Sequence, residues 1–168
     1  HQFEFRSTPT LSFLDFLAIE SIEDDSNAEK DFRIKLRRLM KPSNLDHIVL
    51  TVKNIETSVA FYETVMGMKR EVFGEGRISL KFGNQKINLH QHGKEFEPKA
   101  TQPTPGSADL CFLTETPLEE AMTHVSESGI QILEGPIKRT GATDAIVSFY
   151  LRDPDGNLIE IANPQESA

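Results

Sequence analysis

Apolar and polar residues follow the same order twice along this chain. An apolar, β-branched run over residues 45–52 predicts a strand, and apolar residues at helical spacing follow it as far as Gly67. The same order returns from 108–113 to Gly129. Three pairs of equivalent positions are each 62 residues apart: His47 and Asp109, Asn54 and Thr116, and Gly67 and Gly129. A repeated strand–helix unit that cannot bury its apolar face alone predicts a paired, pseudo-symmetric fold.

The first copy predicts a βαβββ module over about residues 45–92. Asn54 can cap its helix, and Gly67 supplies the left-handed residue that ends it. One helix face collects the apolar residues Ile55, Val59, Tyr62 and Met66. Three more strands are expected at 69–74, 77–82 and 86–90.

The second copy predicts another such module over about residues 107–163. Thr116 is the expected helix cap, with Pro117 at the first helical position and Glu119 completing a capping box. The expected buried stripe is Leu118, Met122 and Val125, and the expected strands lie near 131–134, 146–151 and 158–162. The Asp153–Asn157 segment is a strong turn. The second module has ten more residues between its helix and its last strand than the first, and the excess is centred on 135–143, which is expected to be a loop able to carry binding groups.

Residues 1–44 differ from the rest and are expected to be an N-terminal extension, partly helical or disordered, before a domain at 45–166. A basic amphipathic helix is expected at 30–41. We expect it to pack on its own domain; docking on a membrane or a partner, as in a structural adaptor, is the alternative. Glu4, Asp15 and the acidic stretch 20–25 argue against a transit peptide.

Composition narrows the class of protein. A net charge of −8 and a pI near 5.1 argue against non-specific nucleic-acid binding. No apolar run reaches the length of a membrane span. Cys111 is the only cysteine, so no intramolecular disulfide is possible, which fits a reducing compartment. The sequence favours a cytoplasmic location over a mitochondrial one.

Strand alternation predicts one wholly apolar face, under the helices, and one face with polar residues. The second face collects His47, Asn88, His90, Asp109 and Glu160, so that four strands offer five polar groups to one concave surface. Each residue alone has an ordinary structural explanation, such as a satisfied histidine or a salt-bridged carboxylate. Together they favour a ligand site, because an uncompensated carboxylate on a strand is costly to bury. Imidazole nitrogen with carboxylate oxygens suits a divalent metal that keeps open positions.

Several stretches of the chain resemble a known superfamily. The segments DHIVLTVKNIETSVAFYETVMGM, FGNQKINLH and RDPDGNLIEIAN are similar to the vicinal oxygen chelate superfamily, which includes glyoxalase I, bleomycin-resistance proteins and extradiol dioxygenases. The resemblance covers residues 45–163. The segments GKEFEPKA, PTPGSADLCF and EGPIKRTGAT are similar to the subgroup called glyoxalase domain-containing protein 5.

The resemblance implies an α+β fold in which paired βαβββ modules form a cupped eight-stranded mixed sheet with helices on the outside. It implies a divalent metal (Mn, Zn, Ni or Fe) held by His47, Asp109 and Glu160. Two positions depart from the family pattern: Asp109 is commonly histidine, and Asn88 replaces a frequent glutamate. His90, on the face of Asn88, is therefore a substitute ligand candidate. The resemblance also implies a homodimer.

The leading hypothesis is a metal-dependent lyase, isomerase or dioxygenase-type enzyme acting on a small oxygen-rich substrate. The ion would act as a Lewis acid, and the likeness to glyoxalase I gives Glu160 a proton-shuttle role. Arg139 and Tyr150 are the substrate-binding candidates, with a solvated loop arginine as the plain alternative for Arg139. The rival hypothesis is a non-catalytic small-molecule-binding protein of the bleomycin-resistance type, so enzymatic activity is an open question.

Overall fold

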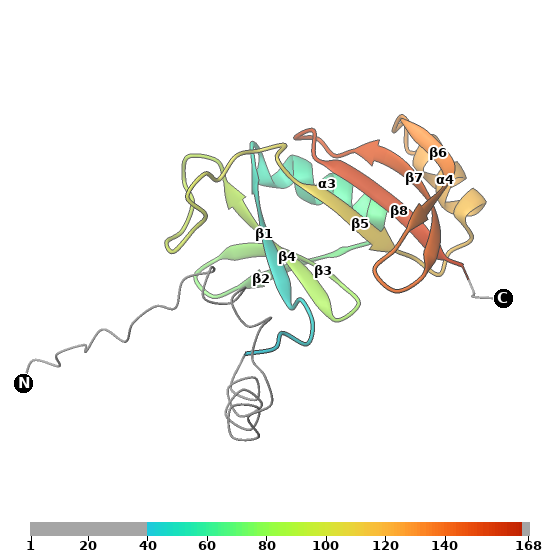
Figure 1. The fold of residues 1–168 in the computed structure, drawn as a ribbon. Helices are drawn as coiled ribbons and strands as arrows, with labels where there is room; N and C mark the ends of the chain where they lie inside the picture. The colour runs from blue at the N-terminus through green and yellow to red at the C-terminus, as the bar shows by residue number, and fades with distance from the viewer. Residues whose placement is uncertain (1–39, 166–168) are drawn as a thin grey trace, which may run out of the picture. The chain divides into compact units, whose positions relative to one another are not determined.

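The computed structural model describes residues 40–165, and two βαβββ modules account for most of them (Figure 1). The first module consists of β1 (His47–Val52), α3 (Ile55–Met66), β2 (Lys69–Phe73), β3 (Arg77–Phe82) and β4 (Gln85–Gln91). The second consists of β5 (Asp109–Leu113), α4 (Leu118–Glu127), β6 (Glu134–Thr140), β7 (Ala145–Arg152) and β8 (Leu158–Pro164). Neither helix of this part of the chain is long and apolar enough to cross a membrane. The expected amphipathic helix at 30–41 falls almost entirely outside the described residues.

Each module forms its own four-stranded mixed sheet. The strand orders are β1-β4-β3-β2 and β5-β8-β7-β6, so the two modules share one topology. The first and last strands of each module pair in parallel, and the other pairs are antiparallel. The α+β class and the paired modules are confirmed, with the eight strands divided between two sheets. In both sheets the first strand lies at an edge.

The strand registers place equivalent residues of the two modules in equivalent positions. Asn88 on β4 lies opposite Val49 on β1, and Glu160 on β8 lies opposite Cys111 on β5. Because side chains alternate along a strand, each of these residues faces the polar side of its sheet. The sequence repeat therefore becomes a structural repeat of the candidate site.

The two helices begin in different ways. Asn54 accepts a hydrogen bond from the backbone N–H of Thr57 at 2.9 Å, and Gly67 adopts φ 63°, so the predicted ends of α3 are confirmed. The predicted cap of α4 is wrong, because Pro117 occupies the cap position and no side chain caps the helix. The carbonyl of Thr116 accepts instead from Asn163, which ties this segment to β8.

The segment after α4 also differs from the prediction. The strand was expected at 131–134 and a loop at 135–143, but β6 spans Glu134–Thr140. The extra residues pair with β7, where Ile137 lies opposite Ser148 after an irregularity in the register. The insertion therefore lengthens a strand instead of forming a free loop.

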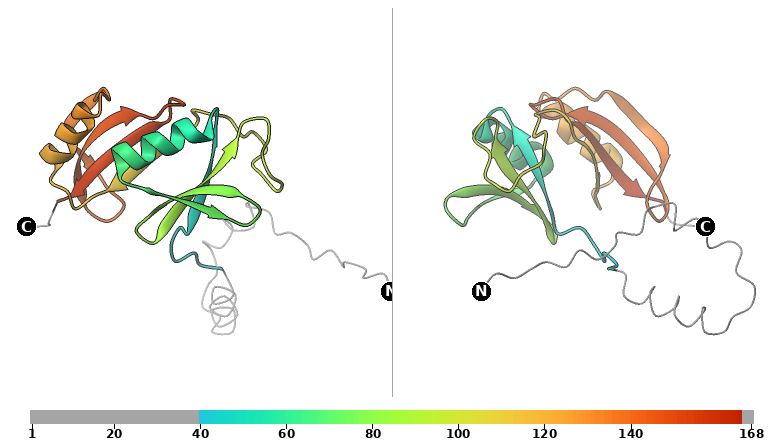
Figure 2. Two further views of the ribbon diagram at one scale, coloured as in Figure 1. Left: turned by 180° about the vertical axis from the view of Figure 1, so that it is seen from behind. Right: turned by 60° about the vertical axis from the view of Figure 1, so that its left-hand side comes forward.

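One hydrophobic core joins the modules. It combines buried residues of both, including Tyr62 of α3 and Phe149 of β7, each 0% exposed. Polar bonds reinforce it, because the Tyr62 hydroxyl donates to Asp153 at 2.9 Å and the Lys53 N–H donates to Asp155 at 2.9 Å. Figure 2 shows α3 beside the strands of the second module in the view from behind. The helix of one module is thus fixed by the β7–β8 turn of the other.

Candidate functional site

The predicted metal ligands are not gathered in one place. Within residues 40–165, no three His, Cys, Asp or Glu side chains lie close enough to hold a metal ion. The structure instead distributes the candidates between two polar faces, one for each module. His47 and His90 belong to the first, and Asp109 and Glu160 belong to the second. Their assignment as ligands stays a prediction.

His47 is the accessible histidine of the first polar face. It lies on edge strand β1, with its side chain 45% exposed and Nδ1 2.7 Å from Oδ1 of Asp46. This hydrogen bond is the main cause of the lowered pKa of Asp46. A carboxylate on one ring nitrogen fixes an imidazole so that the other nitrogen can act as a ligand. His47 therefore has the support expected of a metal-binding histidine.

His90 shares the face of Asn88 but is much less accessible. Its side chain is buried, and its ring lies edge-on to that of Phe96 at 5.6 Å between centroids. Burial lowers the pKa of His90, and the charges of Arg77 and Lys99 lower it further against the opposing effect of Glu95. His90 is therefore a buried imidazole in edge contact with an aromatic ring, and its surroundings disfavour its charged form.

Glu160 and Cys111 form the centre of the second polar face. They lie opposite one another on β8 and β5, with Asp109 on the same side of β5. Burial raises the pKa of the Cys111 thiol to about 11, and the neighbouring Glu160 carboxylate adds to the shift. The sequence interpretation gave Cys111 no role at this site. The sequence did contain a signal for this role, because Cys111 lies two residues after Asp109 and so shares its face of the strand.

Arg139 is already occupied by neighbours of its own sheet. Its Nε donates to the Tyr150 hydroxyl at 3.1 Å, and Nη2 lies 3.2 Å from Oε2 of Glu134. The hydrogen bond to Tyr150 is the main cause of its raised pKa. Tyr150 lies opposite Glu160 in the β7–β8 register and so borders the polar face. Arg139 thus lies on a strand and orients Tyr150.

Buried oxygen atoms without hydrogen-bond partners mark both polar faces. Among the described residues there are four such atoms: Ser79 Oγ, Asn88 Oδ1, Ser148 Oγ and Glu160 Oε1. Ser79 lies opposite Asn88, and Ser148 lies on β7 beside the strand of Glu160. Leaving a buried polar group unpaired costs about 1–3 kcal/mol. Their concentration on the two faces indicates that each face is built to receive a ligand.

Two hollows adjoin the edge strand β1. One, of about 630 Å³, lies between β1 and β5 and is bordered by His47 and Cys111. The other, of about 550 Å³, lies between β1 and the 98–108 segment and is bordered by Thr51 and His90. Both volumes are in the range of small-molecule sites. Both hollows thus border residues of the polar faces, but neither is lined by Asn88, Asp109 or Glu160.

Cys111 gives a first testable prediction. Because its pKa is raised to about 11, iodoacetamide should alkylate the folded protein slowly at pH 7.5, with a rate that rises until about pH 11. Glu160→Gln should lower the midpoint of this profile by removing the adjacent charge. Mass spectrometry of the modified chain measures the rate, and Glu127→Gln is the control for an exposed glutamate. An unchanged profile in Glu160→Gln would contradict the coupling.

Comparison with known proteins agrees with this fold. Virulence protein STM3117 of Salmonella typhimurium is 58% identical over 118 residues. This match covers 70% of this chain and 82% of the length of STM3117. The glyoxalase domain-containing protein RDO1 of Mycosarcoma maydis is 51% identical over 131 residues. This match covers 78% of this chain and 74% of the length of RDO1. The structure of integron cassette protein VCH_CASS1, from the mobile metagenome of V. cholerae, superposes on this chain with a TM-score of 0.73 and 64% sequence identity. The superposition covers 74% of this chain and 98% of VCH_CASS1.

A family model accounts for both modules together. It matches residues 44–161, which begin just before β1 and end within β8. The two polar faces, the edge strands β1 and β5 and the joint core all lie inside this range. The chain therefore belongs to the Glyoxalase/Bleomycin resistance protein/Dioxygenase superfamily.

Proposed function

We propose that this protein is a metal-dependent glyoxalase-like enzyme of lyase, isomerase or dioxygenase type that acts on a small oxygen-rich substrate. The observation that carries the proposal is the set of unpartnered buried oxygens, two on each polar face. The likeness to the glyoxalase domain-containing protein 5 subgroup and a cytoplasmic location are part of the same proposal.

The side chains on the two faces have the chemistry of a divalent metal site. His47 offers an imidazole supported by Asp46, and Asp109 and Glu160 offer carboxylates. Asn88 offers a buried amide oxygen that has no other partner. This donor set suits Mn, Zn, Ni or Fe. The residue types fit a metal, although within residues 40–165 of one chain no three His, Cys, Asp or Glu side chains lie close enough to hold it.

A second copy of the chain would complete the site. Val49 and Leu113, which lie on the polar faces beside the candidate ligands, are 47% and 63% exposed. Apolar side chains exposed at such places are typical of surfaces that a partner covers. In a symmetric dimer the first polar face of one copy would meet the second polar face of the other, giving two equal sites.

In this arrangement the bound metal would supply Lewis-acid stabilisation of charge on two neighbouring substrate oxygens. Asp46 fixes the His47 ring, while the Glu160 carboxylate holds or transfers a proton at Oε1. Tyr150, oriented by Arg139, presents its hydroxyl on the face of Glu160. The hydroxyls of Ser79 and Ser148 are buried, one on each face, and have no other hydrogen-bond partner.

A non-catalytic small-molecule-binding protein is the second candidate. It is favoured by one observation, the absence of a three-ligand cluster within the described part of a single chain. Buried serine and asparagine side chains could bind a polar ligand without any metal.

Metal content in mixed dimers tests the proposal. Elemental analysis of wild type should find two ions per dimer, and His47→Ala and Glu160→Ala dimers should have lost both. A heterodimer of the two variants, purified through two different tags, should keep one site, because one interface then unites an intact His47 with an intact Glu160. His92→Ala is the matched control, since His92 lies near Glu95 at 3.5 Å, beyond the end of β4.

Other outcomes have distinct meanings. A heterodimer with no metal, beside a loaded wild type, would place each complete site within one chain. If the wild type cannot be loaded with Mn²⁺, Zn²⁺ or Ni²⁺, the proposal of a metal-dependent enzyme is contradicted. The non-catalytic small-molecule-binding protein is then the better candidate.

A further inference from the structure

Aromatic and cationic side chains gather over the first polar face. Arg77 lies over the rings of Phe73 and Phe96, at 5.1 and 5.6 Å from their centroids, and the Lys86 ammonium lies 4.2 Å from the Phe73 centroid. His90 contacts Phe96 from β4. These five residues, here called the cationic cluster, come from β2, β3, β4 and the segment after β4.

The position of the cationic cluster follows from the sheet order. Strand β3 lies between β2 and β4, so the contact of Phe73 with Lys86 has to pass over β3. Arg77 and Ser79 share one face of β3, because side chains alternate along a strand. Ser79 is 0% exposed, and its Oγ has no hydrogen-bond partner. A buried hydroxyl donor therefore lies beneath the cations.

The charges of the cationic cluster are not balanced within the described chain. None of the ion pairs found in residues 40–165 includes Arg77 or Lys86. Asp46 is near enough to Lys86 to interact electrostatically, but it is hydrogen-bonded to His47. Two like charges against one ring repel each other, and an anion bound between them would offset that repulsion. The cluster therefore favours an anionic partner.

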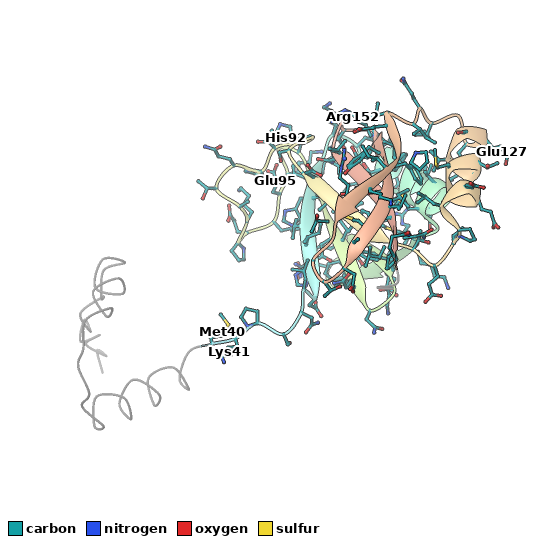
Figure 3. All side chains as sticks on the ribbon, turned by 45° about the vertical axis from the view of Figure 1, so that its right-hand side comes forward. Met40, Lys41, His92, Glu95, Glu127 and Arg152 are labelled. Carbon is teal, nitrogen blue, oxygen red and sulfur yellow. The ribbon has the colours of Figure 1, made fainter. Side chains whose placement is uncertain are left out.

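The chain beside the cluster holds Phe96 in place. Glu95 accepts a hydrogen bond from the Gly93 N–H at 2.9 Å, and its Oε1 lies 3.5 Å from Nδ1 of His92. Figure 3 labels His92 and Glu95 on the segment after β4. Phe96 follows directly and is 44% exposed. A fixed, half-exposed ring beside a guanidinium offers a flat apolar wall to a ligand.

We propose that the cationic cluster is a subsite for a small organic acid, whose oxyanion binds Arg77, Lys86 and the Ser79 hydroxyl and whose flat or apolar body lies against Phe73 and Phe96. The subsite deepens the proposed function, because it adjoins Asn88 on the face assigned to the metal site. It predicts that the substrate is an acid. Arg77, in place of Arg139, is then the arginine that holds the anionic group.

Fluorine NMR of para-fluorobenzoate measures this binding directly. The full chain, stripped of metal with EDTA, should bind the acid and should bind para-fluorobenzamide, its neutral analogue, at least about tenfold more weakly. Arg77→Met and Lys86→Met should each weaken acid binding by about tenfold or more. Lys81→Met is the matched control, because Lys81 is on the same face of β3 but lies 3.7 Å from Glu71.

If Arg77→Met has a lower melting temperature than wild type, Ser79→Ala provides a second test. The Ser79→Ala variant should bind the acid more weakly and should bind the amide as wild type does. Equal affinity of acid and amide, or equal losses in Arg77→Met and Lys81→Met, would overturn the subsite. Because the protein is stripped of metal, failure here is distinct from failure of metal loading.

Discussion

Replacing Asp153 by alanine is expected to lower the free energy of unfolding by about 4 kcal/mol. The carboxylate is 5% exposed and accepts four hydrogen bonds. Oδ1 accepts from the backbone N–H groups of Asp155 and Asn157, both at 2.9 Å. Oδ2 accepts from the Tyr62 hydroxyl at 2.9 Å and from Nδ2 of Asn157 at 2.7 Å. Alanine leaves all four donors without this acceptor.

Tyr62 explains why replacing Asp153 destabilises more than the β7–β8 turn, because its hydroxyl donates to Asp153 from α3 of the first module. Its ring is 0% exposed in the joint core, and burial followed by the charge of Asp153 holds its pKa far above the ordinary value. The hydroxyl is therefore always a donor. Tyr62→Phe removes this donor together with its need for an acceptor and should cost only about 1 kcal/mol.

Urea denaturation followed by circular dichroism measures both variants, and the melting temperature of Asp153→Ala should fall by about 10 °C or more. Glu115→Ala, an exposed acidic residue before α4, is the control and should change stability by less than about 0.5 kcal/mol. A loss below about 1 kcal/mol in Asp153→Ala would contradict the role given to the turn.

Gly135→Ala is expected to lower the free energy of unfolding by about 3–5 kcal/mol. Two effects add at this position: an unfavourable backbone conformation and a steric clash of the new Cβ. Gly135 has φ 125°, which side-chain-bearing residues rarely adopt. A Cβ there would lie 2.5 Å from Cβ of Phe149 and 2.8 Å from the Ser148 carbonyl oxygen. Phe149 is 0% exposed in the core and cannot move aside without opening a cavity.

Gly83→Ala separates the two penalties. Gly83 also has a positive φ, 47°, but no atom lies within 4 Å of the position its Cβ would take. It should therefore cost only about 1 kcal/mol, the penalty of the backbone conformation alone. Thermal denaturation of both variants gives the difference. Equal losses would show that β6 shifts away from β7 without cost.

Much of the fold could be predicted because it depends on local chemistry. The Asn54 cap and the left-handed Gly67 are properties of a few adjacent residues. The prediction for α4 failed because the carbonyl of Thr116 bonds to Asn163, far away in the chain. The β6 prediction failed for a related reason, since pairing with β7 turned a glycine-containing segment into a strand.

The site was predictable only in part for the same reason. Alternation predicts that Asn88 and Glu160 lie on polar faces, but it cannot tell which side chains cover a face. The contact of Phe73 with Lys86 crosses a third strand, and the bond of Arg139 to Tyr150 joins two others. Such contacts depend on sheet order and curvature, so the sequence alone points to Arg139 as the arginine that binds an anion, whereas the proposed subsite uses Arg77.

The bonds from Asp153 and Asp155 into the first module also bear on how the repeat is inherited. Each copy supplies part of what the other buries: Tyr62 has its acceptor in the second module, and Asp155 accepts from Lys53 and Ser58 of the first. The unit of duplication is therefore no longer a unit of folding. Either half made alone would leave Tyr62 without its acceptor or Asp155 without its donors, so we expect neither half to fold as an independent small domain.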